Sequence, residues 1–233
     1  MSLIFQTSGK YFEGNFKRIV SVVPSQTELL FDLGLDEEVV GITKFCVHPE
    51  AWFRNKTRVG GTKQLHLEQI IALKPDLVLA NKEENLQTEI EQLSNHTNVW
   101  VSEIENLNDA LDMIKQVGIM CSATTESEKM INDIAKSFAM PAAKLHSAIY
   151  LIWNEPMMTI GGDTFISDMM LRFGYRNLFA HQSRYPNITT EKLMALNPEC
   201  LLLSSEPFPF TEKHKLYFEK LLPNCKVMLV DGE

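Results

Sequence analysis

The residues best suited to chemistry stand in one short stretch, Phe45-Cys46-Val47-His48-Pro49, directly after a β-branched run at 39–43. Imidazole is a common ligand of borderline metals and also hydrogen-bonds amides, so His48 can coordinate a chelated metal or bind a polar group of a ligand. The competing interpretation is a loop histidine that packs against its neighbours or faces water. Cys46 and His48 alone are too few for a structural zinc site, which needs four protein ligands.

Motifs of enzymes are missing from the 233 residues. The sequence contains no GxSxG nucleophile elbow, no HExxH metal motif and no Walker-type phosphate loop. The pairs Gly60-Gly61 and Gly161-Gly162 lack the flanking residues of phosphate loops, and we expect them to form turns. A hydrolase or a chelatase is therefore the weakest functional interpretation, and we expect no catalytic residue and no required cofactor.

The composition excludes further functional classes. The chain is 45% apolar and 22% charged, with a formal net charge of -8 and no cluster of Lys and Arg. Non-specific nucleic-acid binding needs such a basic cluster, so we expect no nucleic-acid partner. The four cysteines, Cys46, Cys121, Cys200 and Cys225, are far apart and form no CxxC pair. This spacing predicts buried thiols rather than a metal site or a disulfide framework.

The N-terminal residues do not have the pattern of an export signal. They lack a basic start followed by a long apolar core and a small-residue cleavage site, and no apolar run in the chain reaches membrane-spanning length. If a signal has been removed, we expect a periplasmic protein or one anchored outside the inner membrane. If the chain is complete as written, we expect a cytoplasmic protein.

Short strands alternate with helices along the chain. We predict strands at 18–23, 39–43, 77–80, 148–153, 200–203 and 227–230, and helices at 25–33, 67–73, 166–173 and 191–196. Ser25 or Thr27 is expected to cap the first helix, Gly34 to end it, and Lys74-Pro75 to end the second. Strands that alternate with helices are typical of α/β folds with parallel sheets.

A weak internal repeat organises these elements. LEQIIALKPDLVLA, from Leu67, matches TEKLMALNPECLLL, from Thr190, and SQTELLFDLGL, from Ser25, matches FISDMMLRFGY, from Phe165. The segment at 106–145 has helical apolar spacing without a strand signal. The repeat predicts two Rossmann-like α/β lobes, at 17–105 and 146–233, joined by a helical connector, with any ligand in the cleft between them. Chance similarity of two β-α units is the alternative.

Several blocks resemble a known family: RIVSVVPSQTELLFDLGLDEEVVGIT, RVGGTKQLHLEQIIALKPDLVLANKEEN, MTIGGDTFISDMMLRFGYRNLF and YPNITTEKLMALNPECLLL. Their order and spacing are similar to the helical-backbone metal-receptor family, the class III periplasmic binding proteins for vitamin B12, ferric siderophores and haem. The likeness covers about 18–230, and the B12-binding branch is the nearest.

The resemblance implies a monomeric solute-binding protein of an ABC importer. Its ligand is a cobalamin-like, haem or ferric-siderophore metal chelate, held by aromatic and polar side chains from loops at the strand ends. A long backbone helix, here within about 125–144, bridges the two lobes. Membrane and ATPase subunits of the importer are the implied partners, and the binding protein itself catalyses nothing. In the family, the chain continues past the last strand into a further loop with ligand contacts and a closing helix.

The resemblance also implies ligand contacts at particular residues. Phe45 and His48 lie where B12 binders place an aromatic residue against the corrin ring. Thr62 and Asn81 stand where the B12-binding pattern has tryptophans. Both replacements favour another metal chelate over cobalamin itself.

Further candidates come from the second lobe. Trp153 and Tyr185 offer aromatic surfaces for a flat macrocycle, with burial in the lobe core as the alternative. Arg58 and Arg184 are suited to ligand carboxylates or phosphate, with surface charge as the alternative.

Glu68 and Glu191 occupy matched positions in the two repeats. In the resembling family, one such glutamate on each lobe docks onto arginines of the membrane subunits. The alternative is a local role, because a glutamate in the first helical turn is favoured by the helix dipole, with Thr189 placed as a cap. The other open functional interpretation is a cytosolic corrinoid or haem carrier or sensor, which the genomic N-terminus would distinguish from an importer component.

Overall fold

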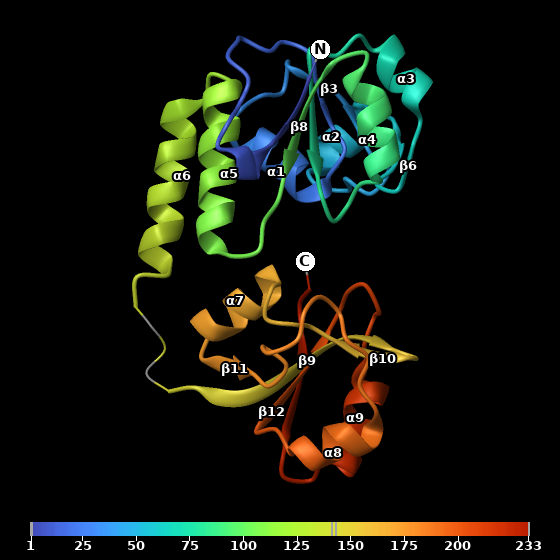
Figure 1. Cartoon of the computed structure of the whole chain (residues 1–233), viewed down its shortest axis with the longest axis vertical. Coiled ribbons are helices and arrows are strands. Elements are labelled where there is room, and N and C mark those ends of the chain that lie inside the picture. The colour runs from blue at the N-terminus through green and yellow to red at the C-terminus, as the bar shows by residue number, and fades with distance from the viewer. Residues whose placement is uncertain (1, 141, 143, 233) are drawn as a thin grey trace. The chain divides into compact units, whose positions relative to one another are not determined.

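Six short strands form one parallel sheet in the N-terminal part of the computed structural model (Figure 1). Its strand order is β1-β8-β7-β2-β3-β4, and each pair of neighbouring strands is parallel. The strands are β1 (Leu3–Phe5), β2 (Ile19–Ser21), β3 (Val39–Ile42), β4 (Thr57–Arg58), β7 (Leu77–Asn81) and β8 (Asn98–Ser102). Val78 and Leu79 on the interior strand β7 are fully buried, as is typical of a strand covered on both faces.

The structure describes residues 2–140, 142 and 144–232, and it divides into two compact units. Unit 1 comprises Met1–Glu103 and Asn108–Ala135, and unit 2 comprises Ile104–Leu107 and Lys136–Glu233. The α/β fold class is confirmed. Positions 141 and 143 of the predicted connector and 233 of the predicted C-terminal lobe lie outside the described residues.

Helix α1 (Pro24–Asp32) begins differently from the prediction. Val23 is its N-cap and makes no side-chain capping bond, so the prediction that Ser25 or Thr27 caps this helix is wrong. Pro24 suits the first helical position because its φ is preset and the N–H that it lacks would be unpaired there. The Thr27 hydroxyl instead donates to the carbonyl of Val23 at 3.0 Å. Gly34 follows the helix at φ +78°, as predicted.

Three further helices of unit 1 are short. They are α2 (Glu50–Asn55), α3 (Leu67–Ala72) and α4 (Gln87–Ser94). Between α2 and α3, the strands β5 (Gly60–Gly61) and β6 (Gln64–Leu65) form an antiparallel hairpin. A Cβ atom at Gly60 would lie 2.4 Å from the carbonyl oxygen of Gln64, and φ at this residue is +102°. Only glycine fits that backbone. The expectation of a turn at Gly60-Gly61 is wrong, because these residues form the first strand of the hairpin and the turn lies at Thr62-Lys63.

Residues 2–16 also contribute to unit 1. β1 adds a parallel edge strand to β8 and is followed by the short 3-10 helix η1 (Gln6–Ser8). The buried Gln6 side chain donates to the carbonyl of Asp109 at 2.7 Å and accepts from the backbone N–H of Glu103 at 3.2 Å. The predicted lobe began at 17 and so omitted this strand.

Two helices, rather than one, occupy the region of the predicted connector. They are α5 (Leu107–Met120) and α6 (Thr124–Ser137), and most residues of both belong to unit 1. The resemblance placed a backbone helix within about 125–144. In the structure α6 ends at Ser137, and the described residues after it, 138–140, 142 and 144, are not helical.

Unit 2 contains a second sheet with the order β10-β9-β12-β13, and β11 pairs with the first part of β9. The strands are β9 (His146–Asn154), β10 (Met157–Thr159), β11 (Tyr175–Asn177), β12 (Cys200–Ser204) and β13 (Lys226–Val230). β9, β11, β12 and β13 are parallel as predicted, but β10 runs antiparallel to β9 because the turn at Glu155-Pro156 folds it back. The helices are α7 (Phe165–Arg172), α8 (Thr190–Leu196) and α9 (Glu212–Leu221).

The predicted repeat corresponds to matching structural elements in the two units. α3 leads into β7 and α8 leads into β12, and both strands lie inside their sheets. Lys74 and Asn197, at matched positions before a proline, have φ of +50° and +41°. Gly34 and Gly174 follow α1 and α7 at φ +78° and +87°. The sequence repeat is therefore also a repeat of backbone conformation.

Each unit has its own apolar core. In unit 1, side chains of β2, β7 and β8 pack with Ile70, Ile90 and Leu93. In unit 2, side chains of β9 and β12 pack with Leu193 and Phe218 on one face, and with Ile160 and Met170 on the other. Across the described residues, none of the helices has both the length and the apolar character needed to span a membrane.

Candidate ligand-binding site

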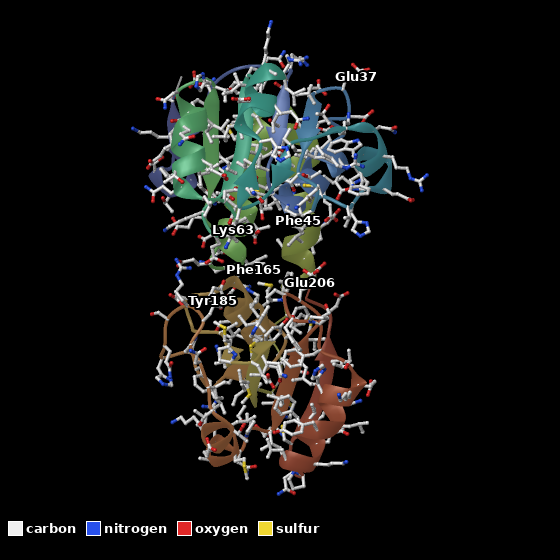
Figure 2. All side chains as sticks on the ribbon, turned by 90° about the vertical axis from the view of Figure 1, so that its right-hand side faces the viewer. Glu37, Phe45, Lys63, Phe165, Tyr185 and Glu206 are labelled. Atoms are coloured by element: carbon white, nitrogen blue, oxygen red, sulfur yellow. The ribbon has the colours of Figure 1, made fainter. Side chains whose placement is uncertain are left out.

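The loops at the carboxyl edge of the unit 1 sheet carry the first group of candidates. Ligands of open parallel α/β sheets bind beyond the carboxyl ends of the strands. Phe45 follows β3, whereas Glu37 precedes it, and Figure 2 shows the two at opposite ends of this unit. Lys63, in the β5–β6 turn, lies at the same end as Phe45 (Figure 2).

Phe45 and His48 lie on the loop between β3 and α2. Phe45 is 53% exposed and packs against Gly61, and the Lys44 ammonium lies 5.1 Å from its ring centroid. His48 is exposed. Cys46, between them, is fully buried, with its Sγ atom 3.1 Å from the hydroxyls of both Thr27 and Thr43. The buried cysteine anchors the loop, and this arrangement leaves the aromatic ring and the imidazole outside.

Thr62 and Asn81 are more enclosed than the other candidates. Thr62 is 9% exposed, and its carbonyl accepts from the Nδ2 atom of Asn85 at 2.9 Å. The Asn81 side chain donates to Ser102 Oγ at 3.0 Å and accepts from the backbone N–H groups of Glu83 and Glu84 at 2.9 and 3.2 Å. These bonds give Asn81 a role in the turn after β7, and its contact with a ligand stays a prediction.

Arg58, at the end of β4, is held by its own neighbourhood. Its guanidinium lies 4.3 Å from the Phe53 ring centroid and donates to the Phe53 carbonyl. These contacts fit the alternative interpretation of Arg58, in which it is a surface charge that packs against its neighbours.

In unit 2, an aromatic pair stands at the carboxyl ends of β9 and β12. Trp153 is 38% exposed, and its ring centroid lies 5.7 Å from that of Phe208 in an edge-on arrangement. The indole N–H donates to the Glu155 carbonyl at 2.9 Å. Phe208 packs in turn against Phe210 and His214. Trp153 is therefore an oriented, partly exposed platform, not a core residue.

Tyr185 and Arg184 lie on the loop that leads to α8. The backbone around Pro186 and Ile188 pairs with β10 and holds this loop in place. Tyr185 is 37% exposed and lies at the same end of unit 2 as Phe165 and Glu206 (Figure 2). Asp163 accepts from the backbone N–H of Arg184 at 2.6 Å, and its Oδ2 atom lies 3.9 Å from Arg184 Nε. A carboxylate of this unit thus already neighbours the Arg184 guanidinium.

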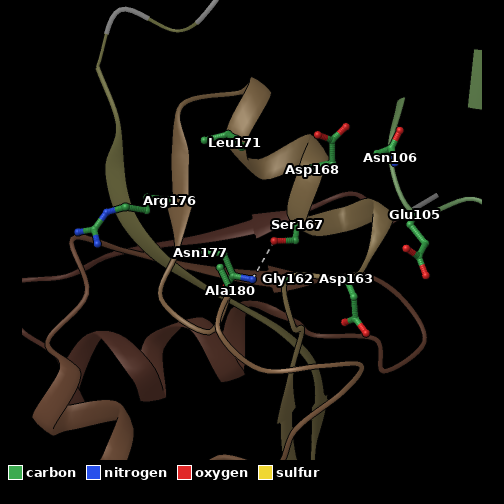
Figure 3. Close-up of a pocket in the computed structure, with 10 residues that line it drawn as sticks. All are labelled: Glu105, Asn106, Gly162, Asp163, Ser167, Asp168, Leu171, Arg176, Asn177 and Ala180. Carbon is green, nitrogen blue, oxygen red and sulfur yellow. Dashed lines mark hydrogen bonds between the residues drawn. The ribbon is translucent and has the colours of Figure 1, made fainter. Parts of the chain in front are cut away.

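A pocket of about 350 Å³ in unit 2 is lined by polar residues around the start of α7 (Figure 3). Asn177 Nδ2 donates to Ser167 Oγ at 3.0 Å inside it. Asp168 accepts from the backbone N–H of Leu107 at 2.9 Å and pairs with Arg172 at 2.8 Å. Asp168 thus joins the 104–107 segment to α7, and these polar groups of the pocket already have partners within unit 2.

Within the part of the chain that the structure describes, no three His, Cys, Asp or Glu side chains are grouped as a metal ion would require. Coordination of a metal by His48 stays a prediction. The predicted metal is part of a chelate, so the chelator supplies its other ligands.

Glu68 and Glu191 both occupy the second position of a short helix and are exposed. The Thr189 side chain caps α8 by accepting from the N–H of Lys192, as predicted. Hydrogen bonds from its own backbone N–H and from Thr189 lower the pKa of the Glu191 carboxyl. The capping role is present at Glu191, and the docking role stays a prediction.

Comparison with known proteins places the chain in a family. A model of the family described as "Periplasmic binding protein" matches residues 19–224, which is most of the chain. The chain belongs to the periplasmic binding protein family. The resemblance to its class III members is thereby confirmed.

Relatives within the family include an uncharacterized ABC transporter substrate-binding lipoprotein, YvrC, of Bacillus subtilis, at 27% identity over 80% of this chain and 63% of the relative. A vitamin B12-binding protein of Vibrio parahaemolyticus is 25% identical over 81% of this chain and 70% of its own length. The periplasmic haem-binding protein HutB of Vibrio cholerae has a similar fold, with a TM-score of 0.79 at 20% identity over 92% of this chain and 90% of that one. The chain thus spans under two thirds of the first of these relatives.

Phe208 and Phe165 were not among the residues expected to contact a ligand. Phe208 supports Trp153, and Phe165, 36% exposed, lies at the same end of unit 2 as Tyr185 (Figure 2). The available signal was the Pro-Phe-Pro-Phe run at 207–210, in the loop after β12, because aromatic residues beyond a strand end lie where a ligand would bind. Phe165 gave no such signal, since the sequence around it is also typical of the start of a helix.

Proposed function

We propose that this chain is the solute-binding component of an ABC importer and that its ligand is a metal chelate, such as haem, a corrinoid or a ferric siderophore. The observation that carries the proposal is the exposure of aromatic rings at the carboxyl edges of both sheets: Phe45 in unit 1, and Trp153 and Tyr185 in unit 2. An aromatic side chain buries a large apolar area against a planar ligand and loses little conformational entropy.

The family membership supports a binding role without catalysis. The relatives named above are substrate-binding, vitamin B12-binding and haem-binding proteins. In the proposed complex, His48 approaches the metal or a polar edge of the chelate, while Phe45 and Tyr185 contact its faces. His48 is exposed and follows the anchored Cys46, so its imidazole can reach a ligand without moving the β3–α2 loop.

Titration with haemin, cyanocobalamin and a ferric hydroxamate tests the ligand class. We expect saturable binding of at least one of them, followed by ligand absorbance and by quenching of tryptophan fluorescence. Phe45→Ala and Tyr185→Ala should each weaken binding about tenfold, because each removes about 1–2 kcal/mol of aromatic contact. Phe31→Ala is the matched control, since Phe31 is 43% exposed on α1 and should leave affinity unchanged. Binding of none of the three compounds would refute the ligand class.

Importer docking is the second part of the proposal, with Glu68 and Glu191 as its contacts. Glu191 also borders a hollow of about 660 Å³ between α8, α9 and the β9–β10 turn, which can receive a protruding side chain of a membrane subunit. Glu191→Gln keeps an oxygen for the capping bonds but removes the charge. We expect Glu68→Gln and Glu191→Gln to weaken stimulation of the cognate importer's ATPase while ligand affinity stays unchanged. Equal stimulation by both variants and the wild type would refute the docking role.

A further inference from the structure

Asn85 connects the loops at the carboxyl edge of the unit 1 sheet. It is 7% exposed and lies in the turn between β7 and α4. Its Nδ2 atom donates to the carbonyl of Thr62 at 2.9 Å and to that of Val22 at 3.2 Å. Its Oδ1 atom accepts from the backbone N–H of Asn81 at 2.8 Å. One side chain thus joins the segment after β2, the β5–β6 turn and the end of β7.

A second set of contacts extends this connection to the Phe45 loop. The backbone N–H of Lys44 donates to the carbonyl of Gly60 at 2.8 Å, and the Phe45 ring packs on Gly61. On the other side of the hairpin, the carboxylate of Glu89 in α4 accepts from the backbone N–H of Leu65 at 3.2 Å. The β5–β6 hairpin is therefore held at one side by Asn85 and Glu89, and it supports the Phe45 loop at the other.

We propose that Asn85 is a positioning residue that sets the geometry of the ligand-facing edge of unit 1, including Phe45, although it touches no ligand itself. Only an amide meets the requirement at this buried position. Two carbonyl oxygens need donors and one N–H needs an acceptor, and an asparagine side chain supplies both from one planar group. A carboxylate would keep the acceptor but would place its second oxygen against two carbonyl oxygens. An alanine would leave all three backbone groups without their partner, at a buried site where that is costly.

Amide hydrogen exchange of the unliganded chain tests this role directly. In Asn85→Asp, the Lys44 amide should exchange about tenfold faster or more, because the hairpin that accepts its hydrogen bond is displaced. The Asn81 amide should stay protected, since the Asp carboxylate still accepts from it. The β7 amides report on global unfolding, so a uniform loss of protection throughout β7 would contradict a positioning role.

Asn98→Asp is the matched control. Asn98 is half-buried in the same sheet and its Nδ2 donates to the carbonyl of Asp76 at 3.1 Å, but it lies at the amino edge. This variant should leave Lys44 exchange unchanged. Asn85→Ser, which keeps one donor, provides an intermediate variant if Asn85→Asp does not fold. Unchanged Lys44 protection in the Asn85 variants would overturn the proposal.

The ligand measurement rests on the proposed function. Asn85→Asp should weaken the affinity for whichever of haemin, cyanocobalamin or ferric hydroxamate the wild type binds by about tenfold or more, and Asn98→Asp should not. An unchanged affinity in Asn85→Asp would overturn the positioning role. Failure of the wild type to bind any of the three would refute the proposed ligand class, whereas the exchange experiment decides the role of Asn85 independently.

Discussion

The four cysteine thiols of this protein are free and buried, as the wide spacing of the residues predicted. Burial raises the pKa of Cys121 to about 12 and that of Cys225 to about 11, because desolvation disfavours the thiolate. The thiolate is the reactive form. We therefore expect an aromatic disulfide reagent to label none of the thiols rapidly in the native chain at about pH 8, and all of them in guanidinium chloride. Rapid labelling of the native chain would contradict the buried arrangement.

At the residue scale, Glu199 makes the stability of the fold depend on pH. It accepts from the backbone N–H of Ser147 at 2.7 Å and lies 3.2 Å from His146 Nδ1, so it connects the starts of β12 and β9. The hydrogen bonds from Ser147, with a further one from His146, lower its pKa below the usual 4.5. A carboxyl with a lowered folded-state pKa stabilises the fold above its unfolded-state pKa, and this contribution is lost as pH falls through the folded-state value.

Glu199→Gln should therefore lower the thermal unfolding midpoint at neutral pH, and its difference from the wild type should shrink below about pH 4. Glu28→Gln, at an exposed glutamate of α1, serves as the control and should change the midpoint little. If the difference between the midpoints of Glu199→Gln and the wild type grew as pH fell, the proposed stabilisation by the ionised Glu199 carboxylate would be refuted.

At the scale of elements, the caps of α8 and α1 should respond differently to substitution. The Thr189 side chain accepts from the N–H of Lys192, so Thr189→Ala should cost about 1 kcal/mol in the free energy of unfolding. Ser25, by contrast, makes no capping bond at the start of α1, and Ser25→Ala should change stability by less than about 0.5 kcal/mol. Urea titration measures both. Equal costs for the two substitutions would contradict the observed helix starts.

At the scale of the whole molecule, the two separate cores predict that a core substitution in one unit destabilises that unit first. Phe218 and Leu93 are almost fully buried, in unit 2 and unit 1 respectively. Phe218→Ala should destabilise by about 3–5 kcal/mol, and Leu93→Ala by about 2–5 kcal/mol, through lost contacts and a residual cavity. Amide exchange should show the loss of protection first in β9, β12 and β13 for Phe218→Ala, and first in β2, β7 and β8 for Leu93→Ala. The reverse pattern would refute the assignment of these side chains to separate cores.

The sequence by itself determined those features that depend on neighbouring residues. The alternation of strands with helices, the glycines that follow α1 and α7, and the Thr189 cap all result from backbone preferences within a few residues. Strand β8 and helices α4 and α9 were not predicted. The repeat at 67–80 and 190–203 also belongs here, because similar local sequences adopt similar helix–strand conformations. The same holds for family membership, since the ordered blocks of sequence carry it.

Only the tertiary structure decided what depends on contacts between distant residues. The pairing of β1 with β8 joins residues almost a hundred positions apart. Thr62 is buried, the Asn81 side chain is hydrogen-bonded within its own turn, and the Asn85 side chain connects three segments. These hydrogen bonds join backbone and side-chain groups at the edge of the sheet that are distant in the sequence, so a local sequence pattern does not predict them. The sequence indicated which strand ends carry candidate residues. The fold decided which of their side chains remain exposed to meet a ligand.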